Sequence, residues 1–283
     1  MKNNVAEKEF ELTRNKFENF LISLSKTWNF QRPLTESIIY SLFTGGKRYR
    51  PVLLIKAYEL LSGKDASDEV FYFASAIECL HTYSLVHDDL PCMDDDDYRR
   101  GQLTSHKKFG EDIAVLTGDA LLNMAYELVY SAIKLSGYNK NYIDAFGLFA
   151  SVTGANGLIS GQIADLAFQC EKATISEVEY IFSHKTCDLI VASIAIGAMI
   201  AGASYDLVNK MKEYAYNFGF AFQLADDLLD GKDDGCSVLS VVSEEKARQM
   251  LEDYTVKATN ALDGIERVEF FKEFALLAKN RLK

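Results

Sequence analysis

The fold of this chain is decided by an apolar helical run that ends in carboxylates, Phe218-Gly219-Phe220-Ala221-Phe222-Gln223-Leu224-Ala225-Asp226-Asp227-Leu228-Leu229-Asp230. Asp226 and Asp230 are one helical turn apart and therefore share a face, with Asp227 beside them. The apolar residues upstream indicate that the helix carries these carboxylates into the protein interior. A surface helix with salt bridges is the alternative, but it fits poorly because no Lys or Arg stands four residues from Asp226 on either side.

A second carboxylate cluster stands earlier in the chain and also ends an apolar helical run, His87-Asp88-Asp89-Leu90-Pro91-Cys92-Met93-Asp94. Pro91 disfavours helical geometry in the residue before it, so we expect the backbone to turn there. Such a turn brings Asp94 back beside Asp88, which helical spacing alone would not do. A solvated acidic loop over residues 94–97 is the alternative.

The two carboxylate clusters predict a site for divalent metal ions. Like charges at contact distance repel and raise one another's pKa, so such clusters need a neutralising partner. Hard cations such as Mg²⁺ prefer oxygen ligands of this kind. Two clusters that face each other across a cavity would hold several Mg²⁺ ions and, through them, a diphosphate.

Basic residues accompany the acidic clusters. The segment Gly45-Gly46-Lys47-Arg48-Tyr49-Arg50-Pro51 combines flexible backbone with three cations in four residues, which suits phosphate oxygens. It lacks the spacing of a P-loop, so nucleotide binding is not indicated. Arg99 and Arg100 follow the acidic loop directly, and pairing with that loop is their alternative role. Lys185 precedes an apolar helix, where its desolvation would be costly without an anion.

Composition favours a large helical core and excludes some partners. The 283 residues are 48% hydrophobic and include only 3 prolines, which leaves long helices unbroken. The net charge of −11 argues against a nucleic-acid partner. The five cysteines and four histidines show no zinc-like spacing, as in a reduced cytoplasmic protein.

No membrane span and no signal peptide are expected. The N-terminus lacks the apolar region of a signal peptide. The longest apolar stretch, residues 189–203, is too short for a bilayer of about 30 Å and is interpreted as a helix buried on all sides.

Apolar residues recur at helical spacing almost throughout, and no two-residue alternation predicts strands. We therefore expect an all-α fold, a single large helical bundle over residues 1–283 with its site between facing helices. The first helix contains Phe10 and Phe17, Pro33 starts the next, Gly45-Gly46 breaks it and Pro51 opens a third. The further helices are expected at residues 67–90, 111–135, 142–168, 177–202, 205–230, 244–262 and 266–282.

Taken together, these residues resemble the trans-isoprenyl diphosphate synthases, and most closely the bacterial farnesyl diphosphate synthases (geranyltranstransferases). The resemblance runs from about Pro33 to the C-terminus. Its segments are residues 45–51, 87–101, 117–119, 157–162, 184–186 and 222–230. It implies the isoprenoid synthase bundle as a single polyprenyl synthetase domain over residues 1–283, usually a homodimer. The implied substrates are isopentenyl diphosphate and allylic diphosphates.

The resemblance also implies roles for individual residues. Mg²⁺, three ions when substrate is bound, would be held by Asp88, Asp94 and Asp226, supported by Asp89 and Asp230. The allylic diphosphate would be bound through these ions and by Arg99 and Lys185. The diphosphate of isopentenyl diphosphate would be bound by Gly46, Lys47, Arg50, His81 and Arg100. Thr186 and Gln223 would line the reacting carbons. The catalytic set would then be Asp88, Asp94, Asp226, Lys185, Thr186 and Arg99.

Product length in this family depends on residues beneath the first aspartate motif. Tyr83 and Ser84 stand five and four positions before Asp88, and Leu80 lies about a turn deeper. An aromatic residue at the position of Tyr83 resembles the farnesyl enzymes, in which it closes the bottom of the pocket. We therefore expect (E,E)-farnesyl diphosphate as the product, with geranylgeranyl diphosphate as the alternative.

One departure from the family pattern lies in the loop over residues 231–237. The family usually has a longer loop there, with a lysine shortly before a Ser/Thr-Tyr pair, and Gly235 stands roughly in the place of that lysine. Lys232 is a possible substitute. The shortened loop keeps open a third possibility, a weakly active or inactive partner subunit of a prenyltransferase.

Two other functions fit less well. A class I terpene cyclase would share the fold and the first motif, but it usually carries an Asn/Ser/Glu metal motif instead of a second aspartate motif. A plain Mg²⁺- or Ca²⁺-binding scaffold would leave the basic residues unexplained.

Overall fold

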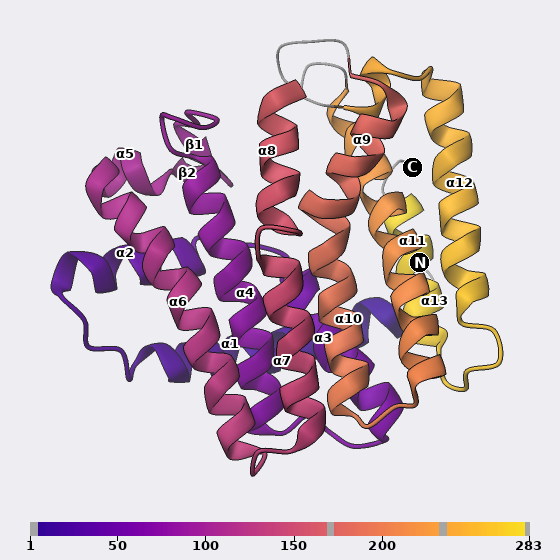
Figure 1. Ribbon diagram of the computed structural model, residues 1–283, viewed down its shortest axis with the longest axis horizontal. Helices are drawn as coiled ribbons and strands as arrows, with labels where there is room; N and C mark the ends of the chain where they lie inside the picture. Colours follow the sequence, from indigo (N-terminus) through magenta and orange to yellow (C-terminus); the bar gives the residue numbers. More distant parts are fainter. Residues whose placement is uncertain (1–4, 169–172, 232–236, 281–283) are drawn as a thin grey trace.

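The computed structural model describes residues 5–168, 173–231 and 237–280 and is all-α apart from one short hairpin (Figure 1). The α-helices are α1 Val5–Ser25, α2 Arg32–Phe43, α3 Tyr49–Ser62, α4 Asp68–Asp88, α5 Ser105–Phe109, α6 Glu111–Leu135, α7 Lys140–Thr153, α8 Leu158–Phe168, α9 Ile175–Ile181, α10 Asp188–Ile200, α11 Tyr205–Asp230, α12 Glu244–Ala261 and α13 Glu269–Asn280. A π-helical turn, Phe182–Cys187, joins α9 to α10, and a short 3₁₀ turn spans Val238–Ser240.

Local sequence explains several helix starts. The hydroxyl of Ser204 accepts the backbone N–H of Leu207 at the start of α11, and Ser243 does the same for Lys246 at the start of α12. Thr174 forms a capping box with Glu177 before α9. These contacts satisfy backbone donors that have no partner within the helix.

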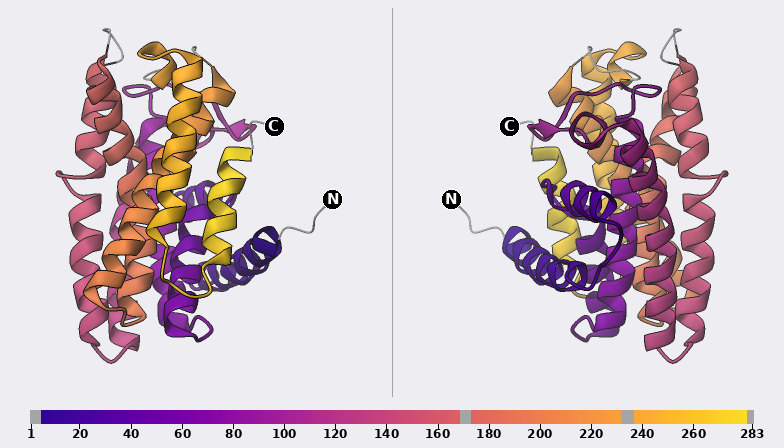
Figure 2. Two further views of the ribbon diagram at one scale, coloured as in Figure 1. Left: turned by 90° about the vertical axis from the view of Figure 1, so that its right-hand side faces the viewer. Right: turned by 90° about the vertical axis from the view of Figure 1, so that its left-hand side faces the viewer.

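The long helices run alongside one another around two central ones (Figure 1). Helix α4 packs against α6, and α10 packs against α3, α7 and α11. Both α4 and α10 are buried along most of their length, as expected for the centre of a bundle. The two end helices, α1 and α13, lie side by side on the flank of the molecule (Figure 2).

The expected burial of residues 189–203 is confirmed for residues 189–200, since most of α10 is buried, but the helix ends at Ile200 and Gly202 is exposed. The continuous helical stretch Ile175–Ile200 is long and apolar enough to cross a bilayer by length and composition, but 67% of its most apolar window is buried inside the protein. A core helix passes the same test, so this stretch is weak evidence for a span.

Expected and observed elements agree at most positions and differ at four, one of which is the short helix α5, which was not expected. Helices α6 and α11 have the expected bounds. The helix expected at 142–168 is wrong as one element, because the weak helix formers Gly154, Asn156 and Gly157 divide it into α7 and α8. The helix expected at 177–202 contains the π-helical turn. The expectation of no strands is also wrong, because β1 Tyr98–Arg99 pairs with β2 Gln102–Leu103.

The hairpin turns at Arg100 and Gly101, of which only the glycine favours the backbone conformation found there. Arg100 and Gly101 both have positive φ, 54° and 75°, which is typical of the two-residue turns that match the twist of paired strands. Strands of two residues are too short for apolar alternation to reveal them in the sequence. The turn sets Arg100 at the tip of the hairpin.

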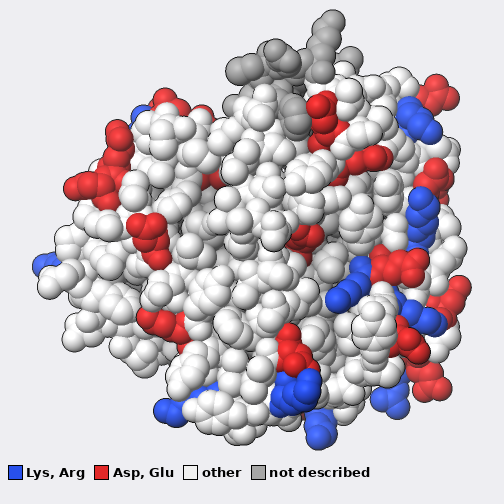
Figure 3. All heavy atoms as spheres, in the orientation of Figure 1, with Lys and Arg blue, Asp and Glu red and all other residues white. Residues whose placement is uncertain are grey.

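Acidic side chains are spread over the face seen in Figure 1, whereas Lys and Arg lie mainly toward its lower and right margins (Figure 3). This pattern agrees with the net charge of −11. An anionic ligand approaching this face must therefore rely on local cations.

Candidate active site

The predicted turn after the first aspartate cluster is confirmed. Helix α4 ends at Asp88, and the backbone N–H of Asp94 donates to the carbonyl of Asp88 over 2.9 Å. The turn thus brings Asp94 next to Asp88, where their charges interact. Asp88 is 8% exposed and therefore buried. Residues 94–97 are exposed, so the alternative of a solvated acidic loop holds for those residues and not for Asp88.

Burial sets the protonation of these carboxyls. It raises the pKa of Asp88 to about 6, and Asp94 adds to the shift while Lys185 opposes it. Burial likewise raises the pKa of Asp94. The ammonium of Lys185 lies 3.9 Å from a carboxylate oxygen of Asp88. One lysine does not neutralise both carboxylates, so the cluster favours a further cation.

Lys185 lies in the π-helical turn and has an anionic partner that the sequence did not reveal. Its ammonium donates to the carboxylate of Asp165 on α8. Helix α8 approaches this turn closely at Gly161, where a Cβ would meet the backbone nitrogen of Lys185 at 2.6 Å. Asp165 was detectable in principle, because it is a single charge in an otherwise uncharged apolar helix. Burial lowers the pKa of Lys185, but Asp88 and Asp165 outweigh it and the net shift is upward.

Arg99 and Asp89 form a separate pair. The guanidinium Nε of Arg99 donates to Asp89 over 2.5 Å, and its Nη2 lies 3.3 Å from Asp96. Both Asp89 and Arg99 line a small hollow of about 40 Å³. In this structure Arg99 thus pairs with the acidic segment, which was the alternative to binding a diphosphate. The pairing of Arg100 is different, because Arg100 donates to the carbonyl of Gly45.

The second aspartate cluster divides into two environments. Asp226 is close enough to Arg50 for their charges to interact. Asp227 is buried and accepts hydrogen bonds from the side-chain amide of Gln223 at 3.0 Å and from the backbone N–H of Val238 at 2.6 Å. The carbonyl oxygen of Gln223 in turn accepts from the hydroxyl of Thr186 at 3.1 Å. Asp230 ends α11, but its side chain and residues 232–236 of the shortened loop lie outside the described residues.

An apolar cavity of about 470 Å³ opens beside the first cluster. Its polar end carries Asp88, Lys185 and Thr186. Its walls come from α4 and α8, with Leu158, Ile163 and Leu166 among the lining residues. Tyr83 and Ser84 line it one turn below Asp88, whereas Leu80 is fully buried in the core behind them. We call this space the apolar cavity.

A second space of about 550 Å³, the basic cavity, is lined by cations. Its lining residues include Lys47, Arg50 and Arg100, with Gly46 beside them. A side chain at Gly46 would bring its Cβ to 2.7 Å from the guanidinium of Arg100, so glycine gives that arginine its room. Arg48 is 4% exposed and binds Glu78 over 2.5 Å and the carbonyl of Leu42 over 2.6 Å. The sequence suggested that all three cations of residues 47–50 bind phosphate. This was wrong for Arg48, because its guanidinium is already paired inside the protein.

Arg50 and His81 belong to both cavities and so mark where the two meet. Nη1 of Arg50 lies 3.3 Å from Nε2 of His81. Burial, followed by the charges of Arg50 and Arg100, lowers the pKa of His81 well below its usual range, so the imidazole is neutral near neutral pH. Since a guanidinium only donates, Nε2 accepts this bond and the proton is assigned to Nδ1.

The carboxylates fit a hard divalent cation that is shared with a bound phosphate. Among the described residues no three His, Cys, Asp or Glu side chains converge on one point as a complete protein cage. Mg²⁺ is commonly held by one or two carboxylates together with waters and substrate phosphates. Asp88 and Asp94, neighbours with raised pKa values, supply oxygen ligands of that type.

Comparisons with known proteins agree with this geometry. The profile of the polyprenyl synthetase family matches residues 31–238. A heterodimeric geranylgeranyl pyrophosphate synthase large subunit from Arabidopsis thaliana is 39% identical over 250 residues, which cover 82% of this chain and 67% of that protein. A dimethylallyltranstransferase from Fischerella ambigua is 42% identical over 219 residues, 77% of this chain and 62% of that protein.

Solved structures show the same fold. An FPP/GFPP synthase from Zymomonas mobilis superposes with a TM-score of 0.87 at 32% identity, covering 97% of this chain and 98% of that one. A geranyltransferase from Legionella pneumophila gives a TM-score of 0.88 at 26% identity, covering 98% and 97%. The apolar and basic cavities that meet at Arg50 and His81 thus lie in an isoprenoid synthase fold. The chain belongs to the polyprenyl synthetase family, is a member of the trans-isoprenyl diphosphate synthases, and is a prenyltransferase of isoprenoid biosynthesis.

Proposed function

We propose that this prenyltransferase condenses isopentenyl diphosphate with dimethylallyl diphosphate, and then with geranyl diphosphate, to give (E,E)-farnesyl diphosphate and diphosphate. The observation that carries the proposal is the meeting of the two cavities at Arg50 and His81. An allylic diphosphate fits the apolar cavity, with its chain between α4 and α8 and its head near Asp88 and Lys185. Isopentenyl diphosphate fits the basic cavity, and its carbon end then points toward the junction.

The residues at the junction position the two substrates and exclude water. In the reaction the C–O bond of the allylic diphosphate breaks and the isopentenyl double bond forms the new C–C bond to the allylic carbon. The released diphosphate takes the proton that the product loses. Mg²⁺ bound to Asp88, Asp94 and Asp226 would stabilise the negative charge on the leaving diphosphate. Lys185 supplies a fixed positive charge there, and the apolar walls keep water from the cationic carbon.

The hydroxyl of Thr186 and the amide of Gln223 are held in one fixed arrangement. Thr186 donates to Gln223, and Asp227 fixes the other end of that amide. A fixed amide and hydroxyl beside the reacting carbons present oriented dipoles without reorganisation during the reaction. This supports the proposed role of both residues in lining the reacting carbons.

Tyr83 supports a fifteen-carbon product. Its ring lies one turn below Asp88, packs edge-on against His87 at 5.5 Å between centroids, and is 8% exposed. A chain that grows from Asp88 down the apolar cavity meets this ring first. Geranylgeranyl diphosphate is the second candidate product, because several similar proteins from Arabidopsis thaliana are named geranylgeranyl pyrophosphate synthases.

The test is product analysis. Purified protein with Mg²⁺, labelled isopentenyl diphosphate and dimethylallyl diphosphate should give a fifteen-carbon alcohol after dephosphorylation. Tyr83→Ala should lengthen the product, whereas Tyr205→Ala, which removes a ring that is 79% exposed, should not. A twenty-carbon product from the unmodified protein would contradict the role of Tyr83, and no product from folded protein would favour an inactive partner subunit.

We also propose a homodimer. Helix α6 exposes Leu116 and Tyr130, which are 55% and 57% exposed and lie near one face, since their spacing is close to a whole number of turns. Asp119, Asn123 and Glu127 are exposed between these two side chains, so they form no continuous apolar patch, and the proposal rests on the resemblance to a family whose members are usually homodimers. The comparison with a heterodimeric large subunit makes a mixed dimer the competing assembly. Light scattering of purified protein should give twice the chain mass of 31.7 kDa, and a monomer would contradict the proposal.

A further inference from the structure

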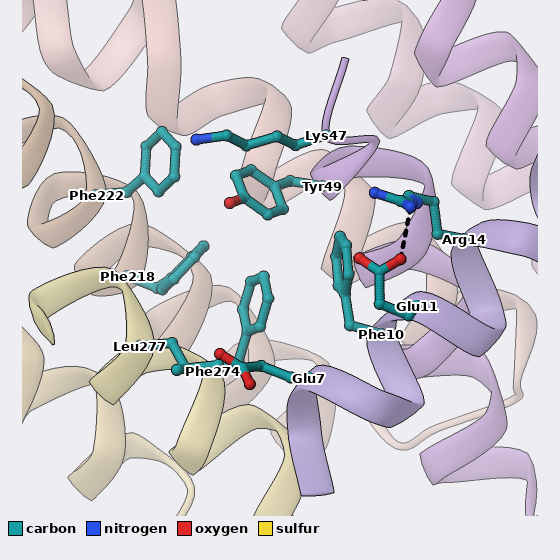
Figure 4. A pocket seen from close by; sticks show the side chains of 10 residues that line it. All are labelled: Glu7, Phe10, Glu11, Arg14, Lys47, Tyr49, Phe218, Phe222, Phe274 and Leu277. Atoms are coloured by element: carbon teal, nitrogen blue, oxygen red, sulfur yellow. Dashed lines mark ion pairs between the residues drawn. The ribbon is translucent and has the colours of Figure 1, made fainter. Parts of the chain in front are cut away.

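The basic cavity has a cation that comes from outside the segment matched by the family profile. Arg14 lies on α1, before residue 31, and lines the same space as Lys47, Arg50 and Arg100. Figure 4 shows its guanidinium on the side of α1 that faces Lys47 and Tyr49. Arg14 also lines the neighbouring aromatic pocket, so it stands on the rim between the two spaces.

Aromatic packing holds α1 in this place. The ring of Phe10, one helical turn before Arg14, lies 5.4 Å from Tyr49 and 5.4 Å from Phe274 between centroids. Tyr49 in turn contacts Phe222 of α11 at 5.4 Å (Figure 4). Because Phe10 is fixed between α3 and α13, the position of Arg14 on the rim is set by packing and not by its own ion pair.

The ion pair of Arg14 is of a kind that an anion can displace. Its Nη2 lies 2.5 Å from Glu11 on the same helix, and the Glu11 side chain is 50% exposed. Its Nε is shielded from solvent and has no hydrogen-bond partner within the part of the chain that the structure describes. Exposed pairs within one helix change an equilibrium by only about two-fold, whereas one charge-assisted bond to a phosphate is worth about ten-fold.

We propose that Arg14 is a further binding residue for the diphosphate in the basic cavity, and that Glu11 is its counter-ion only while the cavity is empty. The bound anion takes N–H donors of Arg14 in place of Glu11. This rests on the proposed function in so far as the anion is the diphosphate of isopentenyl diphosphate. It adds a contact from the N-terminal helix to those from Lys47, Arg50 and Arg100.

Steady-state kinetics with each substrate varied in turn tests the inference. Arg14→Met keeps the apolar stem and removes the charge. It should raise the KM for isopentenyl diphosphate about 5–20-fold, leave kcat within about two-fold, and leave the KM for the allylic substrate unchanged. Arg14→Lys should recover part of the loss, and Glu11→Gln should lower the same KM. Arg248→Met is the matched control, since Arg248 is an exposed arginine paired with Glu244 within α12.

A binding experiment separates this inference from the proposed function. Titration of metal-free protein with inorganic pyrophosphate should give a Kd that rises about 5–20-fold in Arg14→Met and not in Arg248→Met. Equal affinities of Arg14→Met and the unmodified protein would overturn the role of Arg14, whatever the activity. If pyrophosphate binding depends on Arg14 but no condensation occurs, the inference stands and the proposed function fails.

Discussion

The two aspartate clusters each contain a neighbouring pair of carboxylates, and the members of each pair have different surroundings. In the first cluster Asp88 lines the apolar cavity, while Asp89 is bound by Arg99. In the second, Asp226 interacts with the charge of Arg50, while Asp227 is hydrogen-bonded inside the protein. Successive residues on a helix point about 100° apart, so the two members of each pair have different neighbours.

The two clusters differ in the groups that bind Asp89 and Asp227, which we call the inward aspartates. Asp89 is bound by a guanidinium that is 32% exposed and has a second partner in Asp96. Asp227 is bound by two neutral amides, one of which is the backbone N–H of Val238 at the start of the 3₁₀ turn. Removal of Asp89 therefore leaves a partly exposed cation that still has Asp96 as a partner, whereas removal of Asp227 leaves buried donors without that acceptor. We therefore expect the two aspartates of each pair to differ in function. Substitution of Asp227 should also lower the stability of the protein more than substitution of Asp89.

The largest effect on activity is expected from Asp88 and Asp226. Asp88→Ala and Asp226→Ala should each lower kcat by at least about 10²–10³-fold, because each removes a proposed ligand for the cation that stabilises the leaving diphosphate. The metal-free protein should keep its Tm or gain a little, since burial already disfavours the charge of Asp88. Asp144→Ala, at an exposed pair with Lys140, is the control. Near-normal turnover in either variant would remove that residue from the proposed metal site.

The second effect concerns Asp227. Asp227→Ala should lower the free energy of unfolding by about 2–4 kcal/mol, because one buried donor left unpaired costs roughly 1–3 kcal/mol and Asp227 serves two. Asp253→Ala is a close control, since Asp253 accepts the amide of Gln249 over 2.8 Å on the exposed side of α12. Urea unfolding of both variants measures the difference. If both variants lost the same unfolding free energy, the burial of Asp227 would not increase the contribution of its hydrogen bonds to stability.

The third effect is a pH dependence of the metal-free protein. Because burial raises the pKa of Asp88 to about 6, the folded state favours the protonated carboxyl. The stability that Asp88 contributes is therefore fully present below the pKa of the unfolded chain and is lost as pH rises through about 6. The difference in unfolding free energy between the unmodified protein and Asp88→Asn should fall on the order of 2–3 kcal/mol between pH 4 and 7. A difference that stays constant over this range would contradict the shift.

Much of the fold was predictable because apolar periodicity is a local signal. The bounds of α6 and α11 and the turn at Pro91 follow from residues within a few positions of each element. The π-helical turn was not predictable in this way, since it lies within a stretch that remains apolar on either side and so leaves the pattern nearly unchanged. The break at residues 154–157 depended on weak helix formers that the surrounding periodicity outweighed.

The sequence also could not predict ion pairs between residues that are far apart along the chain. Lys185 reaches Asp165 twenty residues away, and Arg48 reaches Glu78 thirty residues away. The sequence therefore suggested a phosphate role for Arg48, and an unmet need for an anion at Lys185. Residue type and spacing identified which charges belong near the site, but only the packing of α4, α8 and α3 determines which of them already have partners.

The smallest effect should come from Asp89. Asp89→Asn keeps an oxygen for Arg99 but loses the charge, so the free energy of unfolding should fall by only about 1 kcal/mol, since a charge-assisted hydrogen bond is roughly twice as strong as a neutral one. Asp96→Asn, at the exposed partner of Arg99, should change stability by less than about 0.5 kcal/mol. The same substitution at position 227 should cost more than at position 89, because Asn at 227 would meet two amide donors with one oxygen. If Asp89→Asn destabilises the protein as strongly as Asp227→Asn, then the partial exposure of Arg99 gives no protection, and the contrast between the two clusters is wrong.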